Sequence, residues 1–316
     1  MEKSRLGQTD LMVTKLGYGA MELRHVDQNQ AERLLKGVLE AGINFIDTSP
    51  DYGPSEEWIG KFISDQRDKY YLATKCGCNV PYPTDDSQTA RHIWTGTQVR
   101  HNIEHSLQKL RTGHIDVWQV HSADATELAN SDVLETMLRI KEEGKVRHIA
   151  VSLSSRAQTL APSGYGRVRL HHQETADHVY QQLQSYLEDD WEELEALQVW
   201  YSALNRGCEE SIVEAQSKGI GLIIRGVVRC LNPWTNLEDF ANQIGLDDLR
   251  GEKETIAQFL LRFAVTHPAL NTAIIGTTSL AHLKQNIQAV RKGPLTKECW
   301  IEATERLDKV GIRSLS

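Results

Sequence analysis

The alternation of short apolar runs with amphipathic helical stretches is the feature that most constrains the fold of this chain. Eight runs of strand length occur between helical stretches, at 14–19, 44–49, 70–76, 115–121, 146–152, 197–202, 220–226 and 272–276. Strands that alternate with helices indicate a parallel sheet with helical crossovers. Eight such units in 316 residues predict an α/β fold, a single (β/α)8 TIM barrel, which typically needs about 250 residues.

The helical stretches carry signals of where they begin and end. Asp27 is a suitable N-cap, and Gly42 can close the following helix in the left-handed conformation. One face of that helix is apolar, with Ala31, Leu34, Leu35, Val38 and Leu39. The same spacing recurs before Gly113, before Gly144 and after Ser279.

Three segments exceed what eight strand and helix units require. We expect 3–13 to form an N-terminal β-hairpin and 296–310 an extra C-terminal helix. The segment 154–196 is too long for an ordinary helical crossing, and two interpretations stay open for it: a lid over the site, or an outer helical insertion. No charge-rich linker divides the chain, so we expect residues 1–316 to form one domain.

The composition excludes several classes of partner. The net charge is -8, the pI is about 5.9, and no basic block is present, so nucleic acid is not expected as a partner. Residues 1–20 lack the long apolar segment that is typical of a signal peptide, and no later apolar stretch approaches the length of a membrane span, about 18 residues. We therefore expect a cytoplasmic protein. The five cysteines are odd in number and mostly far apart, which suggests reduced thiols, and Cys76-Gly-Cys78 alone is a weak metal or redox signal.

Polar residues at the ends of apolar strands are the candidates for catalysis, because barrel active sites lie at the C-terminal ends of the strands. Asp47, Lys75 and His121 end the second, third and fourth predicted strands, and Tyr52 follows Asp47 in its loop. Each residue alone could be structural, as a turn cap, a snorkelling cation, a core histidine or a packed ring. Together they converge on one rim.

These four residues fit the reduction of a carbonyl group. Hydride addition leaves charge on the carbonyl oxygen, so a proton donor must lie within hydrogen-bond reach of that oxygen. We expect Tyr52 to be the acid and Lys75 to lower its pKa, with Asp47 holding the ammonium. His121 would orient the carbonyl group.

The same residues lie in segments that resemble one enzyme family. The stretch GINFIDTSPDYGPSEEWIG, at 42–60, resembles the signature of the aldo-keto reductase family, in which an acid at a strand end precedes Tyr-Gly-x-Ser-Glu. LATKCG at 72–77 and IDVWQVHSAD at 115–124 resemble the lysine and histidine segments of that family. The similarity continues through GYGAM at 17–21, QVWYSALNR at 198–206 and AIIGTTSLAHLKQN at 273–286.

The resemblance implies a reductase of a small aldehyde or ketone that uses a nicotinamide cofactor, NADPH by family expectation, with NADH as the other choice. It assigns Asp47 to the cofactor as well as to catalysis. The remaining cofactor-binding candidates that it implies are Gly19, Ala20, Met21, Ser152, Gln198, Tyr201, Arg225, Gly226, Val228, Gly276, Thr277, Thr278, His282, Gln285 and Asn286.

Two departures from the family pattern concern the cofactor. The family's Ser-Asn at the fifth strand is Ser152-Leu153 here, which removes one amide that would hold the nicotinamide carboxamide. At the adenosine end, the cations for a 2′-phosphate are limited to His282, Lys284 and Arg225.

Other motifs are set aside. HNIEH at 101–105 matches an inverted zinc-peptidase pattern, but His101 and His105 lie opposite the apolar face of their helix, and no segment offers a third ligand. Gly17-Tyr18-Gly19 lacks the third glycine of a dinucleotide fingerprint. His171, His172 and His178 belong to a polar insertion, so no metal site is predicted.

Several alternatives stay open. Trp94 either packs or lines the substrate side. The second functional hypothesis is a nucleotide-binding barrel that serves as a sensor or regulatory subunit with little turnover, and a third is a metal-dependent barrel hydrolase. The sequence leaves the physiological substrate and the oligomeric state unknown.

Overall fold

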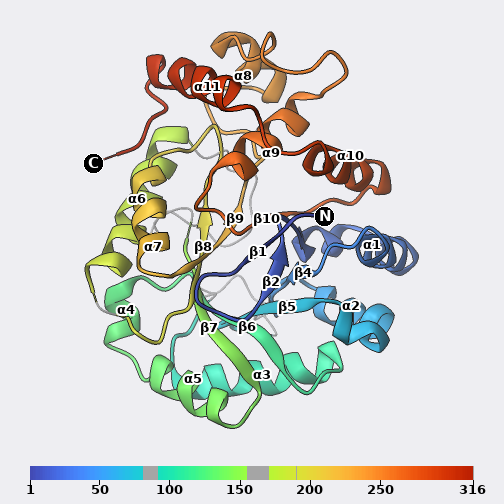
Figure 1. Ribbon diagram of the computed structural model, residues 1–316. Helices are drawn as coiled ribbons and strands as arrows, with labels where there is room; N and C mark the ends of the chain where they lie inside the picture. The colour runs from blue at the N-terminus through green and yellow to red at the C-terminus, as the bar shows by residue number, and fades with distance from the viewer. Residues whose placement is uncertain (81–91, 155–170, 190, 316) are drawn as a thin grey trace.

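The computed structural model describes residues 1–80, 92–154, 171–189 and 191–315. Its strands are β1 (Lys3–Arg5), β2 (Met12–Thr14), β3 (Leu16–Gly19), β4 (Phe45–Asp47), β5 (Tyr71–Cys76), β6 (Ile115–His121), β7 (Val146–Ser152), β8 (Ala196–Trp200), β9 (Gly221–Arg225) and β10 (Thr272–Ile275). The last eight form a closed parallel barrel in the order β10-β3-β4-β5-β6-β7-β8-β9 (Figure 1). The predicted (β/α)8 barrel is confirmed, with strand bounds close to those expected. That the whole chain is one domain stays a prediction.

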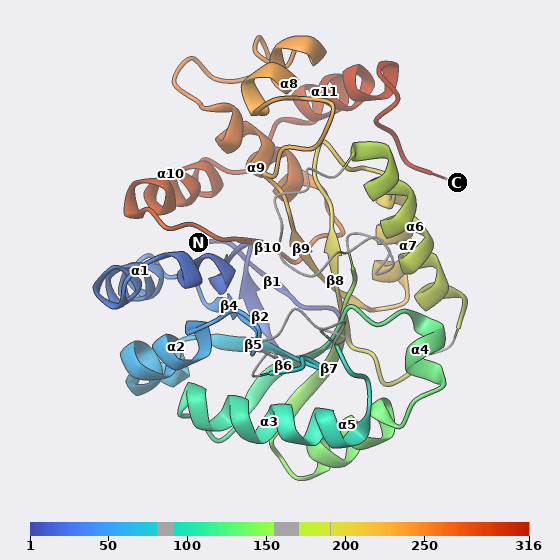
Figure 2. The same ribbon diagram turned by 180° about the vertical axis from the view of Figure 1, so that it is seen from behind.

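Helices surround the barrel, as Figure 2 shows from the far side. They are η1 (Ala20–His25), α1 (Gln28–Glu40), α2 (Ser55–Ile63), η2 (Ser64–Lys69), α3 (Gly96–Leu110), α4 (Ala125–Ala129), α5 (Val133–Glu142), α6 (His172–Glu188), α7 (Glu209–Ser217), α8 (Leu237–Ile244), α9 (Ile256–Thr266), α10 (Leu280–Arg291) and α11 (Lys297–Lys309). The Asp27 side chain caps α1 by accepting from the Gln30 amide at 2.8 Å, and Gly42 follows that helix with φ of 80°.

The three segments beyond the eight strand and helix units form a hairpin, a C-terminal helix and, in part, an outer helix. The N-terminal hairpin is present as antiparallel β1 and β2, and the extra C-terminal helix is α11. Within 154–196, residues 172–188 form α6, an outer helix beside α7, with Leu183 and Tyr186 in the core. The outer-helix interpretation therefore holds for this part, while 155–170 lies outside the described residues.

Strand alternation divides the barrel interior into two layers. Toward the strands' N-terminal ends, the inward residues are apolar: Phe45, Ala73, Val117, Ala150, Ala196, Ile223 and Ile274, packed with Leu6, Leu11 and Val13 of the hairpin segment. Two positions further along six of these strands come Asp47, Lys75, Gln119, Ser152, Gln198 and Arg225. Because side chains two apart share a face, the polar residues form a layer at the C-terminal end of the barrel.

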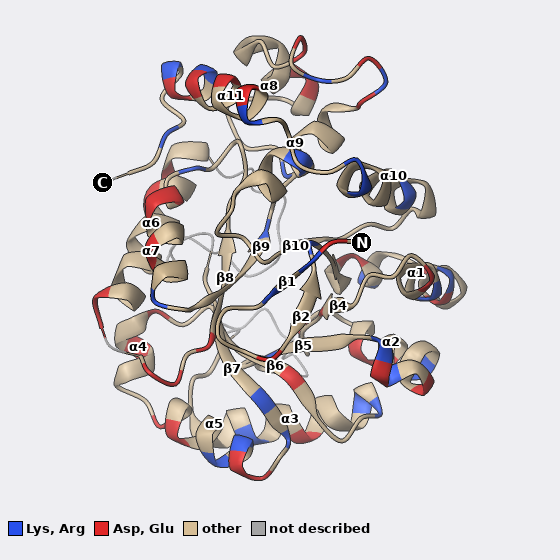
Figure 3. Ribbon diagram, viewed as in Figure 1, with Lys and Arg blue, Asp and Glu red and all other residues tan. Residues whose placement is uncertain are grey.

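Charged residues lie mostly on the outer helices and loops (Figure 3). In the part of the chain that the structure describes, no helix is both long and apolar enough to cross a membrane.

Candidate active site

A buried ion pair forms the centre of the polar layer. Lys75 Nζ donates to Asp47 Oδ2 at 2.8 Å and to the Thr48 carbonyl oxygen at 2.8 Å. The two charged side chains are 0% and 3% exposed. Asp47 Oδ1 also accepts from the side-chain amides of Gln119 and Gln198, each at 2.7 Å. Satisfied hydrogen bonds on both charges are what allow such a pair to persist away from water.

Tyr52 lies between this pair and His121. The Tyr52 ring centre is 4.9 Å from Lys75 Nζ, and its centroid is 6.2 Å from that of His121, with the rings nearly perpendicular. The turn before α2 brings the ring to this place, because the Tyr52 amide donates to the Ser49 carbonyl at 3.1 Å and Gly53 adopts a φ of 59°. The four predicted catalytic residues are thus neighbours.

Burial sets the protonation of the two rings. Burial, together with the charges of Asp47 and Asp51, raises the pKa of Tyr52 well above that of a free phenol. This direction is opposite to the lowering expected from Lys75. Burial also lowers the pKa of His121 well below its usual value. At neutral pH the site therefore holds a protonated phenol and a neutral imidazole.

The predicted carboxamide contacts lie next to the ion pair. Ser152 Oγ donates to Gln198 Oε1 at 3.1 Å, and Gln198 Nε2 is bound to Asp47 and to Gln119 Oε1. At the departure from the family pattern, the Leu153 side chain is buried. Its carbonyl oxygen accepts from Arg225 Nη2 at 2.7 Å, so a guanidinium lies beside the position of the family's amide.

The predicted cofactor residues of the first and last barrel strands lie in two loops that touch. A Cβ on Gly276 would come within 2.9 Å of the Gly19 carbonyl oxygen and of Glu22 Cγ. Ala20 and Met21 begin η1 directly after Gly19, while Thr277 and Thr278 lead from Gly276 into α10, which Ser279 caps. On α10 itself, His282 and Gln285 are exposed and Asn286 is half-buried. Exposed backbone amides at a helix start favour an anion such as a phosphate.

The predicted cofactor residues at the ends of β8 and β9 do not all lie on the rim of the site. Arg225 ends β9, and Gly226 and Val228 lie in the loop after it. The Arg225 guanidinium lies over the Trp200 ring at 5.4 Å. Tyr201 does not share this rim: it is fully buried, and its hydroxyl donates to Glu209 of α7 at 2.5 Å. Strand alternation explains the difference, since Trp200 is two positions from the inward Gln198 and Tyr201 is three.

Sequence reasoning missed some residues of the site and left others undecided. Gln119 binds Asp47 and lies two positions before His121, so strand periodicity could have identified it. Trp94 Nε1 donates to the His121 carbonyl oxygen at 3.1 Å, which places Trp94 beside the catalytic candidates.

The histidine motifs set aside above lie away from this site. His101 and His105 stack on each other along α3, with ring centroids 6.1 Å apart, and Glu104 pairs with Lys145. Among the described residues, neither histidine belongs to a group of three or more metal-ligating side chains. His171 caps α6 through its side chain.

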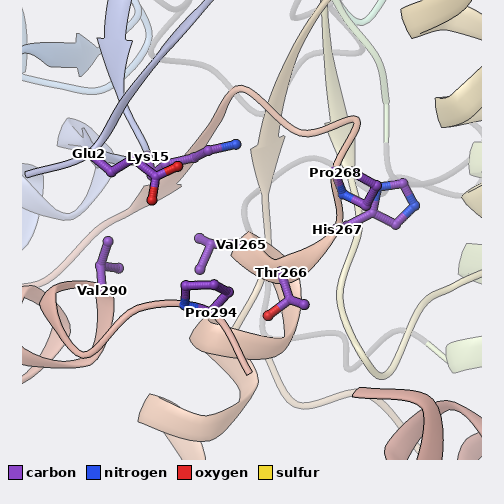
Figure 4. A pocket seen from close by; sticks show the side chains of 8 residues that line it. All are labelled: Glu2, Lys15, Val265, Thr266, His267, Pro268, Val290 and Pro294. Atoms are coloured by element: carbon purple, nitrogen blue, oxygen red, sulfur yellow. The ribbon is translucent and has the colours of Figure 1, made fainter. Parts of the chain in front are cut away.

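A hollow lies near the opposite end of the barrel (Figure 4). Its lining includes Lys15 and Pro268, which precede β3 and β10, together with Glu2, Val265, Thr266, His267, Val290 and Pro294. It is therefore separate from the polar layer that holds Asp47 and Lys75.

The chain is similar to known proteins in both structure and sequence. The solved structure of the aldo-keto reductase AKR11C1 from Bacillus halodurans, in its holo form, superposes with a TM-score of 0.77 at 24% identity, covering 97% of this chain and 96% of that chain. This likeness shows a shared fold. The chain is 25% identical to the "Uncharacterized oxidoreductase YqkF" of Bacillus subtilis, covering 94% of each. It is 23% identical to the L-galactose dehydrogenase of Arabidopsis thaliana, covering 92% of this chain and 88% of that protein.

A family model also matches most of the chain. The model described as "Aldo/keto reductase family" matches residues 15–230 and 246–308, which include every candidate catalytic and cofactor-binding residue named above. The chain belongs to the aldo/keto reductase family.

Proposed function

We propose that this protein reduces the carbonyl group of a small aldehyde or ketone to an alcohol, with hydride from NADPH and with Tyr52 as general acid. The observation that carries the proposal is the buried Asp47–Lys75 ion pair, whose ammonium lies 4.9 Å from the Tyr52 ring centre. A phenol that is protonated at neutral pH and adjoins a fixed ammonium is suited to giving a proton to an oxygen that gains charge.

The chain's own side chains are suited to a nicotinamide cofactor. Gln198 Oε1 and Ser152 Oγ can each accept a further hydrogen bond, so they can receive the N–H groups of a carboxamide. The close approach of Gly276 to Gly19 leaves no room there for a larger side chain, and the start of α10 offers amides to a phosphate. For a 2′-phosphate, the candidate cations in the first turns of α10 are His282 and Lys284, while Arg225 is bound at Leu153. NADPH over NADH rests on the family expectation.

The residues then have separate roles in the reaction. When bound, the cofactor supplies the hydride. Tyr52 gives its proton to the carbonyl oxygen, and the phenolate that remains is stabilised by the neighbouring Lys75 ammonium. Asp47 keeps that ammonium in place, held in turn by the Gln119 and Gln198 amides. Neutral His121 donates a hydrogen bond that orients the carbonyl group.

The test compares the parent chain with Tyr52→Phe, following NADPH oxidation with a panel of reactive aldehydes. Because general acid catalysis contributes about 100-fold or more, we expect Tyr52→Phe to lose at least that factor in kcat while the Kd for NADPH stays unchanged. Tyr180→Phe, on the outer helix α6, is the matched control and should keep full activity. Binding of NADPH with no Tyr52-dependent turnover would instead favour the sensor hypothesis. A cytoplasmic location stays a prediction.

A further inference from the structure

Four side chains with metal-binding atoms lie together beside the catalytic candidates. They are Asp51 in the loop after β4, Cys78 in the loop after β5, His92 before α3, and His121 at the end of β6. One ligand atom from each lies within 4.8 Å of every other. Asp51, Cys78 and His121 are buried, and His92 is half-buried. The set brings a thiol, two imidazoles and a carboxylate to one point.

Contacts with neighbouring residues hold three of the four residues, Cys78, His92 and His121, in place. Cys78 and His92 face each other in an isolated antiparallel bridge, and the Ile93 amide donates to the Gly77 carbonyl at 2.8 Å. Trp94 Nε1 binds the His121 carbonyl oxygen. The segment before α3 is thereby tied to the loop after β5 and to the end of β6.

We propose that Asp51, Cys78, His92 and His121 bind a zinc ion. Thiolate, imidazole and carboxylate are the ligands that zinc takes in proteins, usually four in a tetrahedron. With bonds of about 2.0 Å to N or O and about 2.3 Å to S, neighbouring ligand atoms are about 3.3–3.6 Å apart. Two pairs already have nearly this spacing: Cys78 Sγ is 3.2 Å from His121 Nδ1, and Asp51 Oδ1 is 3.7 Å from the same nitrogen.

Four protein ligands leave no open coordination position, so the role of the ion is structural. It joins the loops after β4 and β5 and the segment before α3 to the end of β6. A metal on His121 Nδ1 leaves the Nε2 proton free for hydrogen bonding, so zinc binding is compatible with the proposed orientation of a carbonyl group. Burial raises the pKa of the Cys78 thiol well above its usual value, and a bound divalent cation would displace that proton.

Cobalt and zinc titration of the chelator-treated full chain tests the proposal. We expect one Co²⁺ per chain with a thiolate-to-cobalt charge-transfer band in the near ultraviolet, and stoichiometric loss of that band when Zn²⁺ is added. Cys78→Ser should abolish the band. His92→Ala should weaken zinc at least about 100-fold, because loss of an outer-shell partner alone costs 10–100-fold.

The controls are Cys299→Ser on α11 and His101→Ala on α3, which should bind both metals like the parent chain. Absence of the charge-transfer band in the parent overturns the proposal, and shows instead a thiol hydrogen-bonded to an imidazole. Unchanged zinc affinity in His92→Ala overturns it as well. The spectrum of the parent chain tests zinc binding even where a variant fails to fold. Because no step uses NADPH or an aldehyde, the outcome is independent of reductase activity.

Discussion

Among single residues, Lys75 is the one on which the site most depends for its stability. It is fully buried and is the cation paired with Asp47. We expect Lys75→Met to lower the free energy of unfolding by about 3–5 kcal/mol, because it leaves the Asp47 carboxylate buried without a counter-charge. Urea unfolding followed by circular dichroism measures the change.

The double variant Asp47→Asn/Lys75→Met is the control for that substitution. It removes the uncompensated charge, so it should recover part of the lost stability while remaining inactive. A single variant as stable as the parent chain would show that the ion pair does not support the fold.

Glu56 gives the protein a pH-dependent stability. It is buried in α2, where Thr74 Oγ1 donates to its Oε1 at 2.6 Å, and burial raises its pKa to about 7. The unfolded carboxyl titrates near its usual value of about 4.3, so the folded state holds the proton more tightly. Stability is therefore lost as the pH rises from that value to about 7.

Glu56→Gln should remove this dependence, because an amide keeps the shape and the acceptor oxygen but carries no charge. At about 1.4 kcal/mol per pKa unit, we expect the variant to be more stable than the parent by about 4 kcal/mol at pH 8 and nearly equal to it at pH 4. Chemical unfolding at both pH values measures this. Glu57→Gln, at an exposed position, is the control. An equal gain at the two pH values would contradict the assignment.

Some residues of the site were predictable from the sequence, and others were not. Asp47, Lys75 and His121 were predictable because each ends an apolar run on the inward face. The predicted place of Tyr201 on the rim differs from the structure, because Tyr201 is three positions from the inward Gln198 and its hydroxyl binds Glu209 of the outer helix α7. Cys78 could not be assigned, since its neighbour His92 is brought to it by a cross-strand bridge that no local pattern reveals.

Among the elements, the end of β3 and the loop between β10 and α10 touch at the predicted cofactor site. We expect Gly276→Ala to push Gly19 away, because the added Cβ would lie 2.9 Å from its carbonyl oxygen. A cost on the order of 1 kcal/mol corresponds to a roughly fivefold higher Kd for NADPH. Fluorescence titration measures it, with Gly113→Ala, which points into open space, as control. Equal affinity in the two variants would show that this contact does not shape the cofactor site.

Element bounds were largely predictable because strand and helix periodicities differ. The end of α3 was less so: Arg111 adopts the left-handed conformation, with φ of 52°, ahead of Gly113. Glycine is favoured at such positions by its lower strain, but here a residue with a side chain, Arg111, ends the helix. Inside 154–196, the polar composition hid the apolar face of α6, whose core residues are separated by charged and amide side chains.

For the whole molecule, the N-terminal hairpin closes the barrel at the end opposite the site. Leu6, Leu11 and Val13 are fully buried against the apolar layer inside the barrel, and Figure 1 shows β1 crossing the barrel opening. The sequence predicted a hairpin at 3–13 from local pattern. It could not predict this location, because the hairpin packs against residues from Phe45 to Ile274, which no local pattern connects to it.

Leu11→Ala tests whether that closure stabilises the barrel without shaping the site. We expect a loss of about 2–5 kcal/mol in the free energy of unfolding, because the substitution removes buried methyl groups and leaves a cavity. Met12→Ala is the matched control: Met12 is 44% exposed, so its change should stay within about 0.5 kcal/mol. Thermal and urea unfolding measure the stability of both variants.

Turnover per folded molecule should be equal in the two variants, since the polar layer lies at the other end of the strands. Lower turnover in Leu11→Ala at a temperature where it is fully folded would mean that the two layers of the barrel are coupled.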